Sequence, residues 1–263
     1  MTTRPAKLLR GALMLHCVGF LLCAAEASAQ GYVADFGTPS LDSNLEVDHE
    51  IYFDGIFYGD YQPGTAPHWS VTSGLGLLNV VLEPTDQPYL SQGPRVKTVS
   101  TYAGDFVAEI TVDLSAANGS FASILMKAPD PWSTSSLVWA GFSVSHGYVG
   151  FLRKDAVFYG EYAGPVVTFD LRLSRIGQSI LAEYRPAGEG EYQLLVDTAD
   201  SFLGGLADPV WFELRNYASG ITDGSAVSFS DFTITPVPEP STYGMVAGVL
   251  ALVFAVRRKR RSA

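Results

Sequence analysis

The sequence predicts an all-β domain of two packed antiparallel sheets, placed between a short apolar leader and a short apolar tail. Between Gly31 and Thr235 the apolar residues show no long helical period. They recur in short runs that alternate with polar residues, and Gly, Pro, Asn and Asp separate the runs. About a dozen such strands without helices can bury their apolar faces only if two sheets pack together.

Alternation with a period of two marks the central strands. In residues 106–114 the even positions are apolar and the odd positions carry polar side chains such as Glu109, which predicts a half-buried strand. Residues 167–174 repeat the pattern and place Asp170 on the outer, solvent-facing side. The predicted core contains Phe106, Ile110, Val112, Phe169, Leu171, Leu173, Ile180 and Phe212.

Turn residues connect these strands into hairpins. Residues 167–174 and 180–184 are expected to pair through a turn at Gly177-Gln178. Residues 137–145 and 148–153 are expected to pair through a turn at His146-Gly147. In the last strand Phe229 and Phe232 are out of phase with each other, so a bulge near Ser230-Asp231 is needed to bring both side chains to one face.

Residues 1–29 have the three parts of a secretory signal peptide. Three cations (Arg4, Lys7 and Arg10) precede an apolar stretch, and Ala27-Ser28-Ala29 supplies the small-x-small pattern that signal peptidase cuts. We expect cleavage after Ala29, with Gln30 as the new N-terminus. A lipoprotein cut before Cys23 is the alternative, although Leu22 stands there in place of a small residue.

Composition limits the chemistry of the mature domain at 30–235. Both cysteines, Cys17 and Cys23, lie in the leader, so the domain has neither disulfide nor thiol chemistry. Of 17 basic residues, three lie in the leader and five in the tail; of 27 acidic residues, only Glu26 and Glu239 lie outside the domain. The remaining nine basic and 25 acidic residues give a net charge of −16, which excludes nucleic-acid binding.

The tail, residues 236–263, combines three signals in a fixed order. Val237-Pro238-Glu239-Pro240 cannot continue a helix or a central strand. The apolar run 243–256 has 14 residues, fewer than the roughly 17–25 of a membrane-spanning helix. Five consecutive cations then stop translocation and hold that end in the cytoplasm: Arg257, Arg258, Lys259, Arg260 and Arg261.

This arrangement resembles the PEP-CTERM sorting signal of Gram-negative bacteria that make exopolysaccharide. The resemblance implies a precursor held in the inner membrane by a short transmembrane helix. It also implies cleavage near Pro238-Glu239-Pro240 by exosortase, a membrane-embedded cysteine transpeptidase. An ordinary tail anchor is the alternative, and it would leave the Pro-Glu-Pro without a purpose.

The middle of the chain carries a second resemblance. Its motifs are Gly104-Asp105-Phe106, residues 171–177 and 181–185, a Gly-rich turn at 186–190 followed by Tyr192, and Ser230-Asp231-Phe232 near the end. Together they are similar to the concanavalin A-like lectin/glucanase superfamily, particularly its laminin-G-like bacterial members. The resemblance implies a two-sheet antiparallel jelly-roll sandwich, with carbohydrate binding expected only by analogy.

Glu46-Val47-Asp48-His49-Glu50 matches the Glu-x-Asp-x-Glu spacing of the glucanases in that superfamily. On a strand the three acids would share one face, so that one glutamate could attack as the nucleophile while the other acts as the acid. However, the segment lies near the start of the mature chain, and the residues before it, 41–45, lack the aromatic and Gly residues expected there. We therefore interpret it as a solvated strand, with no catalytic residue.

Other residue types offer little chemistry. The scattered histidines, without paired cysteines, predict no metal site, and no motif calls for a cofactor. Among the aromatic residues, Trp132 follows Pro129-Asp130-Pro131 on a loop and is the best candidate for a sugar contact. Trp139 stands in an apolar run and is expected in the core.

The predicted protein is thus an exported, non-enzymatic component of the cell envelope or extracellular matrix. Its expected partners are signal peptidase, exosortase, the inner membrane during transit and the exopolysaccharide. The alternative is a secreted glycoside hydrolase that uses Glu46 and Glu50.

Overall fold

In the computed structural model the chain forms two compact units, and one of them is Gly31–Thr235. The structure describes residues 31–53, 56–60, 69–84, 90–129, 137–153, 158–177, 179–199, 209–219, 223–237, 248 and 250. The predicted signal peptide and most of the predicted transmembrane run therefore lie outside the described residues. Among the residues described, no helix is long and apolar enough to cross a membrane.

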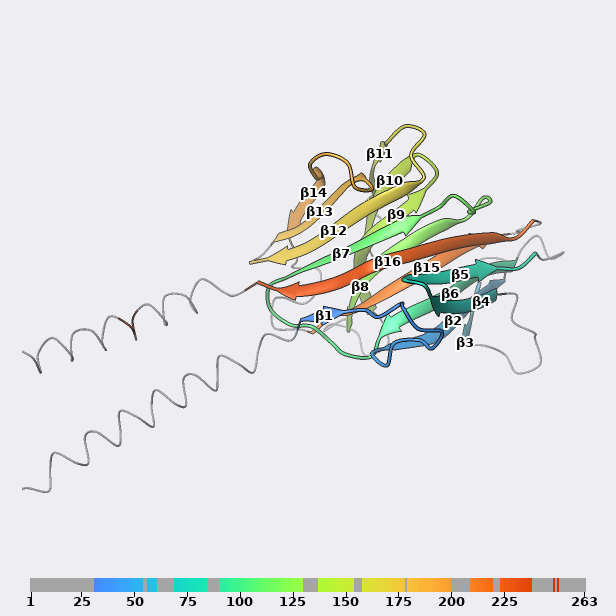
Figure 1. Cartoon of the computed structure of the whole chain (residues 1–263), viewed down its shortest axis with the longest axis horizontal. Coiled ribbons are helices and arrows are strands. Elements are labelled where there is room, and N and C mark those ends of the chain that lie inside the picture. Colours follow the sequence, from blue (N-terminus) through green and yellow to red (C-terminus); the bar gives the residue numbers. More distant parts are fainter. Residues whose placement is uncertain are drawn as a thin grey trace, which may run out of the picture. The chain divides into compact units, whose positions relative to one another are not determined.

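The described residues of Gly31–Thr235 form two sheets of eight strands each (Figure 1). The two-sheet architecture is as predicted, but the described ranges contain sixteen strands where about a dozen were expected. We name the first sheet A, whose strands in spatial order are β14 (Gln193–Ala199), β13 (Ser179–Pro186), β12 (Thr168–Ile176), β7 (Phe106–Asp113), β16 (Ser225–Pro236), β5 (Leu77–Leu82) and β4 (Trp69–Gly74), with β1 (Tyr32–Val33) paired to β16. Sheet B comprises β11 (Phe158–Tyr162), β10 (Tyr148–Arg153), β9 (Leu137–Ser145), β8 (Phe121–Pro129), β15 (Trp211–Ser219), β6 (Leu90–Thr98), β2 (Leu45–Phe53) and β3 (Ile56–Asp60).

Both predicted hairpins are confirmed. Strands β12 and β13 pair antiparallel, with Arg175 opposite Ile180, and Gly177 takes the positive φ of 59° that their tight turn requires. Strands β9 and β10 pair with Ser145 opposite Tyr148. Their turn contains Gly147 at φ 68°, where a Cβ would lie 2.2 Å from the carbonyl oxygen of Gly164, so that only glycine fits.

The core lies between the inner faces of the two sheets. All eight residues predicted for it are at most 3% exposed. The ring of Phe212 in sheet B packs edge-on against Phe106 and Phe232 of sheet A, with ring centroids 5.5 Å and 6.0 Å apart. Because the described parts of the mature chain contain no cysteine, this packing and the strand ladders stabilise the fold.

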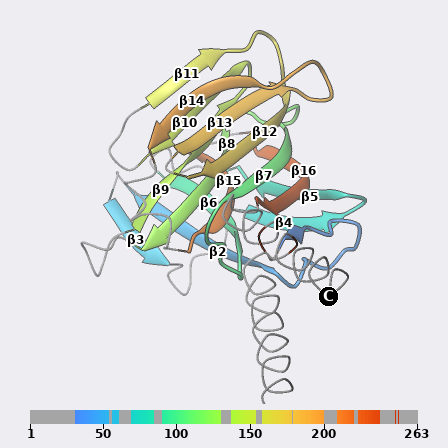
Figure 2. The ribbon, with the colours of Figure 1, turned by 90° about the vertical axis from the view of Figure 1, so that its left-hand side faces the viewer.

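The bulge predicted in the last strand is confirmed. Asp231 adopts a φ of 53°, which inserts one extra residue into β16 and lets Phe229 and Phe232 both point inward. Beyond the bulge, Ile234 and Thr233 pair with Tyr32 and Val33 of β1. In the view turned by 90°, β13, β12 and β7 run side by side across the same layer as β16 (Figure 2).

One buried polar residue bridges the two sheets. Asn216 on β15 is fully buried, and its Nδ2 donates to the carbonyl oxygens of Val80 at 2.9 Å and Ser225 at 3.2 Å, both in sheet A. Buried hydrogen bonds of this kind are directional, unlike apolar contacts. Asn216 therefore ties β15 of sheet B to β5 and β16 of sheet A.

Candidate functional site

The outer face of sheet B carries an unusual row of charged side chains. On β15, Phe212 and Leu214 point inward, so Glu213 and Arg215 point to the outer face. The same alternation on β8 brings Lys127 to this face, and on β6 it brings Arg95 and Lys97. The ladder aligns Glu213 with Lys97 and, one strand further, Lys97 with Glu46 of β2.

The charges at the centre of this face are buried. The Nζ of Lys127 lies 2.8 Å from Glu213 Oε2, and these side chains are only 6% and 1% exposed. Arg215 also bonds to Glu213 through its Nε. Desolvating charged groups is costly, so such a cluster is expected only where partners compensate it or where function requires it.

Two tryptophans flank Lys127 on the same face. Strand pairing places Trp139 of β9 and Trp211 of β15 on either side of Lys127, and both indoles are half-buried. Trp139 was expected in the core; this expectation is wrong, because Ala140 and Phe142 occupy the inward positions of β9. Next but one to Trp139, Gly141 packs tightly against the neighbouring strand: a Cβ there would lie 1.9 Å from the carbonyl oxygen of Ile124, so that only glycine fits.

Of the sequence-predicted site residues, Glu46 belongs to this face, at its edge. Its carboxylate forms a 3.0 Å ion pair with Lys97 and its side chain is 51% exposed. Glu50 lies on the same strand, opposite Gly93 and Asp60, but the side chains of residues 48–50 lie outside the described residues. Trp132, the signal peptidase site and Pro238-Glu239-Pro240 also lie outside them, as do the cations at 257–261.

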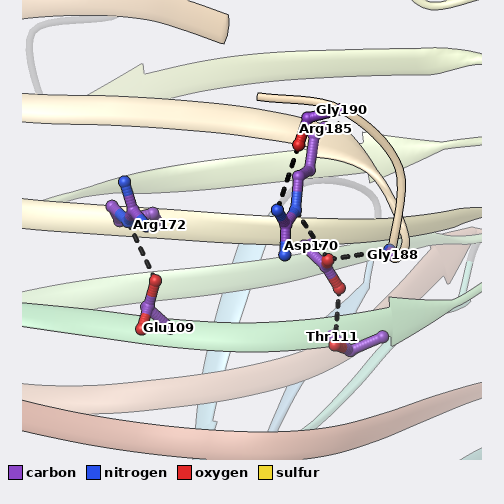
Figure 3. A network of polar contacts seen from close by, with 7 residues as sticks. All are labelled: Glu109, Thr111, Asp170, Arg172, Arg185, Gly188 and Gly190. Carbon is purple, nitrogen blue, oxygen red and sulfur yellow. Dashed lines mark hydrogen bonds and ion pairs between the residues drawn. The ribbon is translucent and has the colours of Figure 1, made fainter. Parts of the chain in front are cut away.

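The outer face of sheet A carries a second polar network, centred on Asp170 (Figure 3). Asp170 Oδ1 accepts a 2.7 Å bond from Thr111 on β7. Its Oδ2 accepts from Arg185 Nε at 2.9 Å and from the Gly188 N–H at 3.0 Å. Asp170 was expected to face solvent freely; it does lie on the outer face, but these partners leave it only 9% exposed.

The network sets the ionisation of its members. Burial alone would raise the pKa of Asp170, but the hydrogen bonds from Gly188, Thr111 and Arg185 outweigh it and hold that pKa below its ordinary value. The guanidinium carbons of Arg172 and Arg185 lie 3.7 Å and 4.5 Å from the ring centroid of Tyr192. Arg172 also pairs with Glu109 at 2.9 Å.

Beside this network lies an open groove of about 540 Å³. Its lining comes from β7, β12, β13, β16 and the turn after β13, and comprises Glu109, Ile110, Thr111, Asp170, Arg185, Ala187, Gly188, Tyr192, Asp231 and Thr233. Sequence reasoning missed both the groove and the charges around Lys127. In the described ranges no three His, Cys, Asp or Glu side chains converge in a way that could hold a metal ion.

Comparisons with known proteins bear on the tail and on the fold. Residues 236–261 match the PEP-CTERM protein-sorting motif. The structure is similar to a non-specific endo-β-1,3(4)-glucanase of family GH16, with 12% identity and a TM-score of 0.56 over 80% of this chain and 95% of that one. No curated protein matches the sequence.

Two further solved structures share the fold. One is a β-glucanase of Bacillus licheniformis, with 12% identity and a TM-score of 0.51 over 79% of this chain and 98% of that one. The other is the lectin UEA-II complexed with galactose, with 9% identity and a TM-score of 0.51 over 78% and 98% of the two chains. At these identities the likeness concerns the fold alone. The chain therefore joins a PEP-CTERM sorting motif to a jelly-roll β-sandwich of the concanavalin A-like type.

Proposed function

We propose that this protein is an exported, non-enzymatic component of the cell envelope or extracellular matrix that binds an acidic polysaccharide on the outer face of sheet B. The sorting motif at 236–261 carries the proposal, because it is the address of a protein that exosortase processes. The motif begins where β16 ends, at Pro236, so processing in the tail would leave the sandwich whole.

The tryptophan pair supports a saccharide ligand. Indole rings stack on the apolar faces of sugar rings, while nearby charged groups bond to hydroxyls. Trp139 and Trp211 stand two strands apart, which corresponds to roughly 10 Å, so they can contact different sugar units of one chain.

The charge of the face favours an acidic saccharide. Arg95, Lys97, Lys127 and Arg215 are four of the nine basic residues between Gln30 and Thr235. The carboxylates whose side chains are described on this face are Glu46 and Glu213, and Asp48 stands opposite Arg95 in the ladder, so nearly half of the basic residues of a domain of net charge −16 gather here beside a few acidic ones. Uronate groups would be drawn to this face and repelled by the rest of the surface.

The pairing of the carboxylates favours binding over hydrolysis. A glycosidase needs one carboxyl group free to give a proton and a second free to attack or to activate water. Glu213 is 1% exposed and bound by Lys127 and Arg215, and Glu46 is held by Lys97. Neither is arranged for those roles.

The test combines sorting with binding. Replacing Pro238, Glu239 and Pro240 with Ala should trap a membrane-bound precursor, and sequencing the mature wild type should find Gln30 at its start.

The mature protein should bind oligogalacturonate in calorimetry, and the Trp139→Ala/Trp211→Ala variant should lose that binding. Tyr159→Ala, at an exposed position of the edge strand β11, is the matched aromatic control. Normal release of the triple variant, or unchanged binding without both tryptophans, would refute the proposal.

A further inference from the structure

The sandwich has two outer faces, and the groove on sheet A lies on the opposite side of the core from the charged face of sheet B. Its volume, about 540 Å³, falls within the roughly 300–1,000 Å³ typical of small-molecule sites. Being open, it can admit a segment of a longer chain. It is therefore large enough for a ligand of its own.

Contacts within the protein hold the walls of the groove in place before any ligand binds. Asp170 holds the Gly188 turn against the sheet, and Arg185 Nη1 reaches the carbonyl oxygen of Gly190 at 3.2 Å. Tyr192 is held next to the turn by the two guanidinium groups that lie over its ring. A ligand that enters this groove finds its polar contacts already ordered, which lowers the entropy cost of binding.

Asp231 contributes a strained residue to the groove. Among the described residues only Leu75 and Asp231 have a positive φ without being glycine. Glycine would adopt the φ of 53° at no steric cost, whereas Asp costs free energy there. What the aspartate adds at this bulge is a carboxylate on the groove wall, where Ser230 Oγ donates to it at 2.9 Å.

The charges of the lining define the class of ligand. Glu109, Asp170 and Asp231 contribute three negative charges and Arg185 one positive charge; with Arg172, which pairs with Glu109 beside the lining, the net charge is −1. An acidic polysaccharide would be repelled, while the hydroxyl groups of a neutral sugar can donate to the exposed carboxylate of Asp231. Thr111 and Thr233 add hydroxyl groups to the lining.

We infer that this groove is a second saccharide site, specific for a neutral glycan, and that the protein bridges a neutral and an acidic polysaccharide through its two opposite faces. The neutral site shares with the proposed function only the premise that the ligand is a saccharide, whereas the bridging also rests on the acidic site proposed for sheet B. The two sites share no residue, so each can be tested while the other is intact.

The test uses the mature secreted protein with cellohexaose and laminarihexaose as neutral probes and oligogalacturonate as the acidic probe. Wild type should bind one of the neutral probes, and Asp231→Gly should weaken this binding about tenfold, as expected for losing one charge-assisted hydrogen bond. Binding of oligogalacturonate should not change. Because glycine suits this φ, the variant should melt at the same or a higher temperature, which separates loss of binding from loss of folding.

The bridging of the two polysaccharides is measured separately, by turbidity. Wild type should make a mixture of soluble β-glucan and polygalacturonate turbid, while Asp231→Gly should need a higher protein concentration to do so and the double tryptophan variant should leave the mixture clear. Absence of neutral-glycan binding by wild type, or full binding by Asp231→Gly, would overturn the inference. In either case retained binding of oligogalacturonate would leave the proposed function standing.

Discussion

Replacing Asp170 with Ala is expected to cost about 2–4 kcal/mol of unfolding free energy, although the residue lies on the outer face of a sheet. The change removes the acceptor of three hydrogen bonds, those from Thr111, Arg185 and Gly188. Bonds to a charged partner contribute roughly 1.5–3 kcal/mol each when buried. Arg185 is 29% exposed, so water replaces part of its bond and the total stays well below the sum of three.

Urea unfolding at neutral pH measures this loss, with Glu189→Ala as the control. Glu189 is exposed in the same turn, so its substitution should change stability by less than about 0.5 kcal/mol. The difference between wild type and Asp170→Ala should also depend on pH. Since folding lowers the pKa of Asp170 below 3.8, its stabilisation is present above that pH and is lost as the pH falls through the folded value. A cost no larger than that of Glu189→Ala, or one that persists unchanged in strong acid, would refute the reasoning.

Three further outcomes are expected. Phe169→Ala should cost about 3–5 kcal/mol in the same urea assay, because Phe169 is fully buried between the sheets. Tyr184→Phe should make the free energy of unfolding fall less steeply at alkaline pH. Burial and a 2.9 Å bond to Glu161 raise the pKa of Tyr184 from 10.0 to about 12. The stabilisation by Tyr184 is therefore present below pH 10.0 and is lost as the pH rises toward 12. Reducing-sugar assays should find no β-glucan hydrolysis by wild type, and hydrolysis that Glu46→Gln or Glu50→Gln abolishes would favour the glycosidase alternative.

The strands were predictable because the alternation of buried and exposed side chains can be read within each strand's own sequence. A strand with one face in the core must alternate, and residues 106–114 and 167–174 do so regardless of where their partners lie in the sequence. The bulge at Asp231 was predictable for the same reason, since Phe229 and Phe232 could not otherwise both be buried. Turn glycines such as Gly177 then fixed which strands pair.

The two outer faces were not predictable, because they depend on register between distant strands. The residues next to Lys127 in the sequence do not indicate that Glu213 is its partner, because the two meet only through the pairing of β8 with β15. One signal was present: charged residues stand at outward positions of both strands, between apolar residues that point inward. The error at Trp139 shows the limit of counting apolar residues, since its own strand places it outward beside Ala140.

The position of the last strand links the fold to the sorting motif. Strand β16 lies inside sheet A between β7 and β5, and its end also pairs with β1. A cut before Ile234 would therefore remove a ladder partner of β1 and expose the core next to Phe232. The strand ends at Pro236, and the proposed cleavage at Pro238-Glu239-Pro240 lies just beyond it. The first strand depends on the other end of the chain, because the predicted signal peptidase cut leaves only Gln30 and Gly31 before Tyr32. Both predicted processing sites thus lie outside the last hydrogen-bonded residues, so cleavage at them would leave both sheets, and with them both polar faces, intact.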